Sequence, residues 1–212
     1  LEAFESSAIP ATDVERLISG AVPSVTVDSS LETRVLRGAG KSYPDLVRMW
    51  DGQPAGLPDA VVVPTSESEI SAIFDLCASE GIAVVPFGGG TSVVGGVAPE
   101  RNGFGAAIAL DMSGFDSIHR IDVDGEIASL GAGLLAPAAE AALAEHGMTL
   151  GHFPQSWEQA SLGGFAATRS SGQASTGYGR FDRNVLGFDM VSPAGTFSAI
   201  PSPGSAAGPD LR

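Results

Sequence analysis

Residues 60–92 read AVVVPTSESEISAIFDLCASEGIAVVPFGGGTS, with two short apolar runs on either side of a helical pattern. The first run, residues 60–63, is β-branched and is stopped by proline, as is typical of a buried strand. Ser66 and Glu69 have the spacing of a capping box at the start of a helix. The second run, residues 82–85, predicts another buried strand, and a βαβ unit makes the two strands parallel. The helix between them carries apolar residues at helical spacing: Ile70, Ile73, Phe74 and Cys77.

Outside this stretch the sequence predicts mainly short strands joined by turns. An Asp-Gly turn at 124–125 favours an antiparallel hairpin between the strands on either side of it. One helix is expected to begin at Pro137 and run to Glu145, and the Ala-, Ser- and Gly-rich residues 160–171 predict another. The N-terminal part is less regular, with a short helix expected at 13–19 and a turn followed by a helical turn at 42–50. The expected strands are residues 106–110, 117–123, 126–130, 185–191 and 196–200, with a turn at 113–114 after the first of them. The predicted class is α+β.

The charge balance narrows the possible functions. The chain of 212 residues has 25 acidic and 11 basic side chains, a net charge of −14, which disfavours binding to nucleic acid or to an anionic membrane surface. No run of 18 apolar residues occurs in the sequence. The single cysteine, Cys77, is expected in the core of its helix, excludes a disulfide framework and predicts a cytoplasmic location. The three histidines, His119, His146 and His152, lack metal-ligand spacing, so no metal site is expected.

A glycine-rich loop follows the second predicted strand. Three consecutive glycines let successive backbone N–H groups point into one concavity that holds an anion, and Thr91 and Ser92 add hydroxyl donors. No lysine or arginine lies between Glu80 and Arg101, so a phosphate bound here would be held by backbone dipoles. The alternative is a plain turn that needs glycine for its geometry. From the local sequence alone both interpretations stay open.

Two further glycine clusters invite a functional interpretation. Residues 131–136 fit the dinucleotide pattern Gly-x-Gly-x-x-Gly/Ala, but the acidic residue required about 20 positions later is absent, so a strand-to-helix turn is the better interpretation. Residues 154–172 combine several hydroxyls with the pair Gly163-Gly164 at an expected helix start, where free N–H donors are available. The alternative for this second cluster is a capped helix with small residues for close packing.

Three motifs in this order carry a family resemblance: residues 61–65 with the helix after them, residues 85–92, and residues 161–165. Together they resemble the FAD-binding domain of vanillyl-alcohol-oxidase-type flavoenzymes, from about residue 59 to residue 195. The resemblance implies two FAD-binding subdomains, residues 59–111 as a small parallel βαβ part and residues 112–200 as a mainly antiparallel part. They would follow an N-terminal segment, 1–58, and precede a tail, 201–212.

Within that family the chain is most similar to alkyldihydroxyacetonephosphate synthases. Gly151-His152-Phe153-Pro154-Gln155-Ser156 and Tyr178-Gly179 belong to this similarity. The glycolate-oxidase and D-lactate-dehydrogenase branch has Thr-Asn-Ala-Gly-Gly where this chain has Thr168-Arg169-Ser170-Ser171-Gly172. One departure is Gln155, because the synthases tend to have Asp at this position.

The resemblance implies FAD as the cofactor, with its pyrophosphate on the glycine loop and further contacts from the second cluster. Binding would be non-covalent, because relatives that tether flavin through this loop have a histidine where this chain has Thr91. The implied cofactor-binding residues are Pro86, Phe87, Gly88, Gly89, Gly90, Thr91, Ser92, Gln155, Ser156, Ser161, Gly163, Gly164, Thr168, Arg169, Ser170 and Ser171.

The implied activity is that of an alkylglycerone-phosphate synthase, in which a flavin adduct allows a fatty alcohol to replace the acyl group of acyl-dihydroxyacetone phosphate. The alternatives are an FAD-dependent D-2-hydroxy-acid dehydrogenase of the D-lactate or glycolate oxidase kind, and a flavin-binding module without catalysis of its own. Neither cluster contains a candidate acid–base residue of suitable type, so catalytic residues are expected in a substrate-binding cap domain outside this chain. We therefore expect a fragment that is inactive alone and whose partners are FAD and a small or lipid-precursor substrate. A homodimer stays open.

Overall fold

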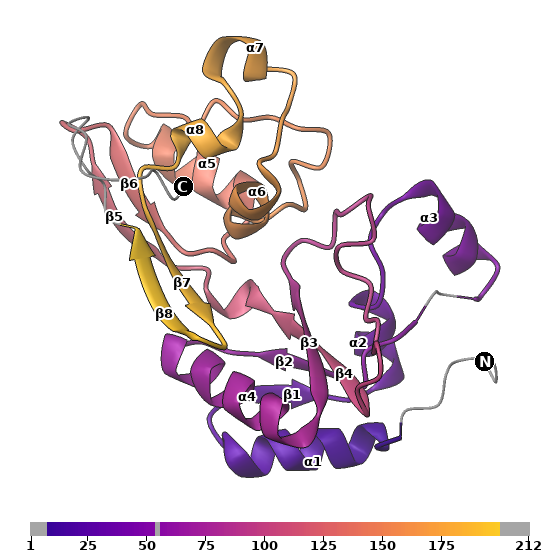
Figure 1. The fold of residues 1–212 in the computed structure, drawn as a ribbon. Helices are drawn as coiled ribbons and strands as arrows, with labels where there is room; N and C mark the ends of the chain where they lie inside the picture. Colours follow the sequence, from indigo (N-terminus) through magenta and orange to yellow (C-terminus); the bar gives the residue numbers. More distant parts are fainter. Residues whose placement is uncertain (1–7, 54–55, 200–212) are drawn as a thin grey trace. The chain divides into compact units, whose positions relative to one another are not determined.

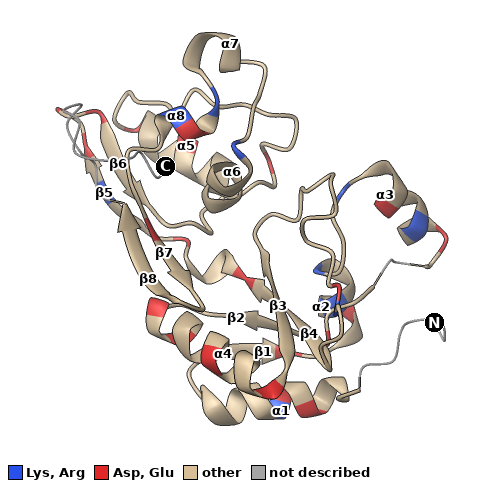
Figure 2. Cartoon of the chain, in the orientation of Figure 1, with Lys and Arg blue, Asp and Glu red and all other residues tan. Residues whose placement is uncertain are grey.

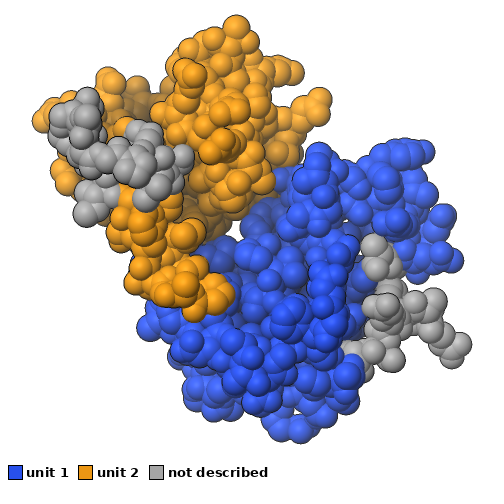
Figure 3. Space-filling view, in the orientation of Figure 1, with its two compact units in different colours: residues 1–115 blue, residues 116–212 orange. Residues whose placement is uncertain are grey.

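The computed structural model describes residues 8–53 and 56–199, which form two compact units. Unit 1 is Leu1–Phe115 and unit 2 is Asp116–Arg212, coloured separately in Figure 3. The described helices and strand of the expected segment 1–58 lie in unit 1. The expected tail, 201–212, lies outside the described residues.

Unit 1 is built on a four-stranded sheet with the order β1-β2-β4-β3. Strands β2 (Ala60–Val63) and β3 (Ile82–Phe87) are each parallel to β4 (Ala106–Asp111), whereas the edge strand β1 (Thr26–Asp28) is antiparallel to β2. All six residues of β4 are buried, as expected for the central strand of a parallel sheet. The two strands of the βαβ unit are therefore parallel as predicted, but β4 lies between them.

Helices α1 (Ala11–Ala21) and α4 (Glu67–Glu80) pack on this sheet and against each other (Figure 1). The core includes Val14 and Ile18 from α1, and Ile70, Ile73 and Cys77 from α4. Phe74, expected on the same apolar face, is half-buried. Gly81 ends α4 in the left-handed conformation with φ 66°, which glycine adopts without steric strain.

At the predicted capping box of Ser66 and Glu69, the Glu69 carboxylate bonds to Thr65 and Ser24. The Ser66 hydroxyl accepts a hydrogen bond from Glu69 N at 3.3 Å. The buried Glu69 carboxylate accepts from Thr65 N at 2.7 Å and from the Ser24 hydroxyl at 2.5 Å, which connects α4 to the segment before β1. The Ser24 hydroxyl is also the main reason that the pKa of Glu69 is lowered. The side chain therefore caps the helix and joins two parts of unit 1.

Three short helices complete unit 1. They are α2 (Leu31–Leu36), α3 (Tyr43–Trp50) and the 3₁₀ helix Met112–Gly114. A reciprocal capping box at Ser42 and Asp45 begins α3, which is longer than the helical turn predicted there. Strand β1 and helix α2 were not predicted, and α1 extends beyond the expected residues 13–19 at both ends.

Unit 2 contains two antiparallel hairpins. Strands β5 (Ile118–Asp122) and β6 (Ile127–Leu130) pair around the Asp-Gly turn as predicted, and they belong to a different sheet from β4 although only a short turn separates β4 from β5. Strands β7 (Phe188–Ser192) and β8 (Gly195–Ala199) form the second hairpin. Strand β7 begins later than the expected residue 185, and Ile200 lies outside the described residues.

Helices α5 (Ala136–Ala144), α6 (Leu162–Thr168), α7 (Ser175–Tyr178) and α8 (Phe181–Asn184) belong to the same unit. Pro137 lies in the first turn of α5 as predicted, and α6 covers only the middle of residues 160–171. One apolar core joins these elements: Leu134, Ala136, Ala139, Ala160, Leu162, Phe165 and Phe181. Within the described ranges, no helix is long and apolar enough to cross a membrane.

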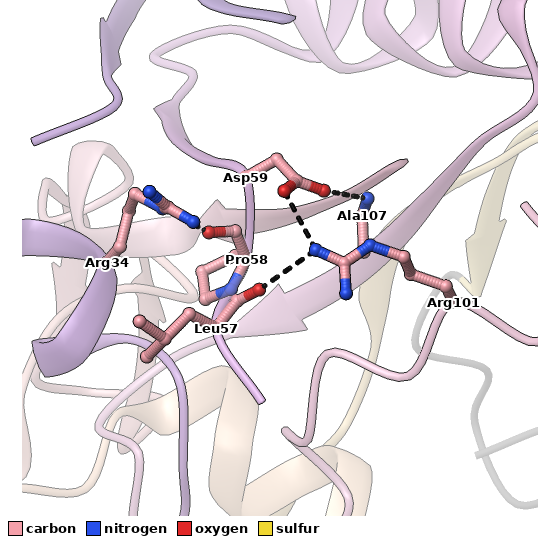
Figure 4. A network of polar contacts seen from close by, with 6 residues as sticks. All are labelled: Arg34, Leu57, Pro58, Asp59, Arg101 and Ala107. Carbon is pink, nitrogen blue, oxygen red and sulfur yellow. Dashed lines mark hydrogen bonds and ion pairs between the residues drawn. The ribbon is translucent and has the colours of Figure 1, made fainter. Parts of the chain in front are cut away.

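A buried ion pair holds the amino ends of β2 and β4 together (Figure 4). Arg101 Nη2 lies 2.8 Å from Asp59 Oδ1, and Ala107 N donates to Asp59 Oδ2 at 2.8 Å. The Asp59 side chain is 2% exposed and that of Arg101 14%, so removing either partner would leave a buried charge. This network lies at the opposite end of the parallel strands from the glycine loop and has a structural role.

Candidate functional site

The glycine loop leaves the carboxyl end of β3, at the edge where ligands of parallel sheets bind. Gly88 and Gly89 are half-buried, Gly90 is buried, and Thr91 and Ser92 are half-buried. The N–H groups of residues 89–92 donate no hydrogen bond to another described residue. Because a buried N–H group is rarely left without an acceptor, these donors fit an anionic ligand or ordered water.

Gly90 has a structural requirement of its own. Its φ is +65°, and a Cβ built on it would lie 2.5 Å from the Phe87 ring. A side chain at Gly90 is therefore excluded by the loop itself, whatever the loop binds. Gly89 has no positive φ and is the better position for testing ligand contact.

The loop is held from outside by the segment before α3. Lys41 N donates to the Ser92 carbonyl at 2.7 Å, and a Cβ at Gly40 would collide with that carbonyl oxygen. The Ser92 hydroxyl accepts from Gly96 N at 3.1 Å, so its oxygen stabilises the turn that follows. The main chain of Ser92 is thereby anchored, and the loop is a defined structure.

The structure brings a cation to the beginning of the loop. Arg37, directly after α2, places its Nε 2.6 Å from Asp111 Oδ2 and its Cζ 5.3 Å from the centroid of the Phe87 ring. Arg37 thus lies near the loop although no lysine or arginine occurs between Glu80 and Arg101; that backbone dipoles hold a phosphate there stays a prediction. Sequence inspection missed Arg37 because it lies about fifty residues before the loop, in a segment with no clear periodicity.

The second cluster has a different character. The first turn of α6 was expected to offer free N–H donors, but they are already bonded: Leu162 N to Leu134 O at 3.0 Å, Gly163 N to Ala132 O at 2.7 Å, and Gly164 N to the Ser161 hydroxyl at 3.3 Å. The expectation of free donors was wrong because the turn at 131–136 and the Ser161 hydroxyl supply the acceptors. The turn itself occurs as predicted, between β6 and α5.

Close packing accounts for the glycines in this cluster. A Cβ on Gly163 would lie 2.9 Å from both the Cβ and the carbonyl oxygen of Ala132, and one on Gly164 would lie 3.1 Å from the Ser161 hydroxyl. A Cβ on Gly172 would lie 2.7 Å from Pro154 N. The alternative of a capped helix with small packing residues is therefore what the geometry around α6 shows.

The other predicted contacts of unit 2 differ in exposure. Gln155, Thr168, Arg169 and Ser171 are exposed, whereas Ser156 and Ser170 are half-buried and Ser161 is buried. Arg169 ends α6 with φ +50°, a conformation uncommon for a residue with a side chain. Within the same cluster, Trp157 Nε1 is buried and has no hydrogen-bond partner among the described residues.

His152 was assigned no role and is buried in unit 2. It is 2% exposed, its ring centroid is 4.7 Å from that of Phe165 and 5.2 Å from that of Phe181, and its Nε2 lies 2.9 Å from Ser170 Oγ. Desolvation lowers the pKa of His152 below its usual value. A neutral imidazole therefore positions Ser170, one of the predicted contacts.

A separate open pocket of about 410 Å³ occurs in unit 2, and none of the predicted site residues lines it. Its walls are Ser175, Thr176, Gly177, Gly179, Arg180 and Arg183.

No group of three or more His, Cys, Asp or Glu in the described part of the chain could hold a metal ion. Cys77 is buried, and burial raises the pKa of its thiol to about 12, so it is a core residue as predicted.

The family is shown by comparison with known proteins. The family model described as "FAD binding domain" matches residues 58–200, and the chain belongs to this family, in the class of FAD-linked oxidases. An alkyldihydroxyacetonephosphate synthase of Caenorhabditis elegans is 33% identical over 189 residues, which are 89% of this chain and 32% of that protein. An uncharacterized FAD-linked oxidoreductase of Escherichia coli is 36% identical over 74% of this chain and 32% of its own length.

A further curated relative and a solved structure support the same family. A mitochondrial D-lactate dehydrogenase of Arabidopsis thaliana is 33% identical over 73% of this chain and 27% of that protein. A solved alkyldihydroxyacetonephosphate synthase superposes with a TM-score of 0.81 at 28% identity, covering 98% of this chain and 40% of that one. The α+β fold of the vanillyl-alcohol-oxidase type is thereby confirmed. The chain spans about a third of the length of the curated relatives named here.

The pKa of His152 generates a prediction about pH. The folded state keeps the imidazole neutral, whereas the unfolded chain takes up a proton below about pH 6.5. Because the unfolded state then binds more protons, stability should fall as the pH drops from about 7 to about 5. His152→Gln should flatten this dependence in urea unfolding curves, and His119→Gln, which alters an exposed histidine, should not.

Hydrogen bonds lower the pKa of Asp28 and of Glu69, so their contribution is lost only at more acidic pH. Equal pH dependence in wild type and His152→Gln would show that His152 titrates alike in both states.

Proposed function

We propose that the glycine loop binds the diphosphate of FAD through the backbone N–H groups of residues 89–92. The observation that carries the proposal is that these donors have no acceptor in the described chain, although Gly90 is buried. Charge-assisted hydrogen bonds from backbone N–H groups to an anion are among the stronger ones in proteins. The Thr91 hydroxyl, for which no hydrogen bond to a described residue is seen, adds a donor beside them.

The second cluster contributes differently in this proposal. The N–H groups in the first turn of α6 are already hydrogen-bonded within the chain. In this proposal, cofactor contacts from unit 2 therefore come from the main chain near Arg169 and from side chains such as Ser156, Thr168, Ser170 and Ser171. His152 holds Ser170 in place for this purpose. Gln155 is exposed and carries no charge, so it offers a hydrogen bond where the resemblance expects a carboxylate.

For the whole protein we propose the activity of an alkylglycerone-phosphate synthase, the exchange of the acyl group of acyl-dihydroxyacetone phosphate for a fatty alcohol. Relatives with this activity in their names are 33% and 36% identical to the chain. Bound FAD supplies the reactive isoalloxazine ring, and the residues of this chain bind and orient it. A D-2-hydroxy-acid dehydrogenase is the second candidate, supported by the Arabidopsis relative. A cytoplasmic location accompanies the proposal, and a homodimer stays open.

The activity is tested by supplying both substrate classes to the full-length protein. The proposal expects incorporation of labelled fatty alcohol into the ether product, with no reduction of an electron acceptor by D-lactate or glycolate. Acceptor reduction without alcohol exchange would favour the dehydrogenase instead. The 212-residue chain alone should show neither activity, because neither cluster contains a positioned acid–base group.

Flavin binding should be non-covalent. Thr91 occupies the loop position where tethered relatives place histidine, and its hydroxyl does not form that bond. Acid precipitation should therefore release the yellow colour into the supernatant. Colour that stays in the washed pellet would contradict this prediction.

Gly89→Val tests the loop itself. A side chain there should block the approach of the diphosphate, and the loss of about three hydrogen bonds at roughly 1.5–3 kcal/mol each should remove most FAD affinity. Flavin fluorescence titration of the folded variant measures this, beside its cofactor-free melting curve. Gly20→Val is the matched control, because a Cβ on Gly20 meets nothing within 4 Å.

Gly90→Val is unsuitable for this purpose. Its positive φ and the Phe87 ring make it destabilising in any case. If folded Gly89→Val binds FAD as wild type does, the loop is a plain turn and the diphosphate binds elsewhere.

A further inference from the structure

A buried carboxylate lies directly beside the beginning of the glycine loop. Asp111 pairs with Phe87 in the last register position of β3 and β4, and Gly88 follows Phe87 in the chain. The Asp111 side chain is 3% exposed, and its Oδ1 accepts a hydrogen bond from Ser113 N at 2.9 Å. A negative charge at this position opposes the binding of any anion by the loop, because burial weakens screening by water.

Arg37 compensates this charge from outside the βαβ unit. Its Nε lies 2.6 Å from Asp111 Oδ2, and no other hydrogen bond of its guanidinium is seen among the described residues. The Arg37 side chain is 32% exposed, so part of the group faces solvent. One cation thus touches both strand ends from which the site is built.

The ring of Phe87 joins this cation to the loop. The Arg37 guanidinium lies over the ring, and the ring touches Gly90 so closely that a Cβ there would lie 2.5 Å from it. Phe87 itself is buried. The Phe87 ring therefore lies between the Arg37 guanidinium and the backbone of Gly90.

We propose that Arg37 is a positioning residue of the anion site: it neutralises Asp111 and holds Phe87, so that the glycine loop accepts the diphosphate of a nucleotide cofactor. The inference rests on the proposed function of the loop. It assigns to Arg37 and Asp111 a role in cofactor affinity beyond fold stability. The positive charge of Arg37 acts on this affinity by neutralising the Asp111 carboxylate.

The second buried pair of unit 1 provides a matched control. Arg101 and Asp59 make an ion pair of similar length at the amino ends of the strands (Figure 4). Figure 2 shows basic residues on α2 and α3, and acidic residues along α4. Arg101→Met leaves a buried carboxylate as Arg37→Met does, but away from the loop. It should lower the melting temperature without changing the FAD affinity of the folded molecules.

The experiment measures dissociation constants on folded chains that have been freed of flavin. The variants are Arg37→Met, Arg37→Lys, Asp111→Asn and the double variant Arg37→Met/Asp111→Asn. The probes are FAD by fluorescence quenching, ADP by competition with FAD, and riboflavin, which lacks the diphosphate. Each titration is repeated at low and high salt.

Arg37→Met should weaken FAD and ADP binding by about tenfold or more and leave riboflavin binding unchanged, because the uncompensated Asp111 carboxylate repels the diphosphate. The loss should shrink at high salt. The double variant should recover most of the affinity, Asp111→Asn should bind FAD at least as well as wild type, and Arg37→Lys should lie near wild type.

Two results would overturn the proposal: unchanged FAD affinity in Arg37→Met, or a double variant as weak as Arg37→Met. Gly89→Val separates this failure from failure of the proposed function. Lost FAD binding in Gly89→Val with full binding in Arg37→Met refutes only the role of Arg37. Full binding in both variants refutes the loop as the diphosphate site.

Discussion

Strand β4 is buried along its whole length, and this burial determines the arrangement of unit 1. Six residues without an exposed face exclude an edge position, so β4 lies between β2 and β3, and both run parallel to it. The carboxyl ends of the strands consequently meet at one edge of the sheet. Phe87 and Asp111 form the last pair at that edge, and the glycine loop begins immediately after it.

A buried carboxylate also lies at each end of β4. Asp59 bonds to Ala107 near the beginning of the strand, and Asp111 is its last residue. Each carboxylate is matched by an arginine from outside the βαβ unit, Arg101 in one case and Arg37 in the other. In a chain with 25 acidic and 11 basic residues, these two arginines stabilise buried charge where it would otherwise oppose folding. The pair at the carboxyl end, Arg37 and Asp111, lies beside the glycine loop, where Arg37 compensates the negative charge of Asp111.

Local patterns were sufficient to predict the βαβ unit, the hairpin of β5 and β6, and the turn at 131–136, because periodicity and turn chemistry are local properties. They were insufficient for β1 and α2, which have three and six residues and carry too few apolar positions to show a period. The contact between Arg37 and Asp111 spans 74 positions in sequence, and only the folded sheet brings the two together. The hydrogen bonds of Leu162 N and Gly163 N could not be predicted from the sequence either, because their acceptors lie in the turn at 131–136, about thirty positions earlier.

The two glycine clusters therefore differ in chemistry although their sequences look alike. Around α6, Gly163 is required because Ala132 lies against it, and the N–H groups of the first turn are hydrogen-bonded within the chain. In the loop after β3, the N–H groups of residues 89–92 lack acceptors in the described chain, and Gly89 has no positive φ to explain it. N–H groups without an acceptor in the chain are satisfied by a group that approaches from outside, such as an anion or ordered water. This reasoning favours the diphosphate at the loop and leaves side-chain contacts to the second cluster.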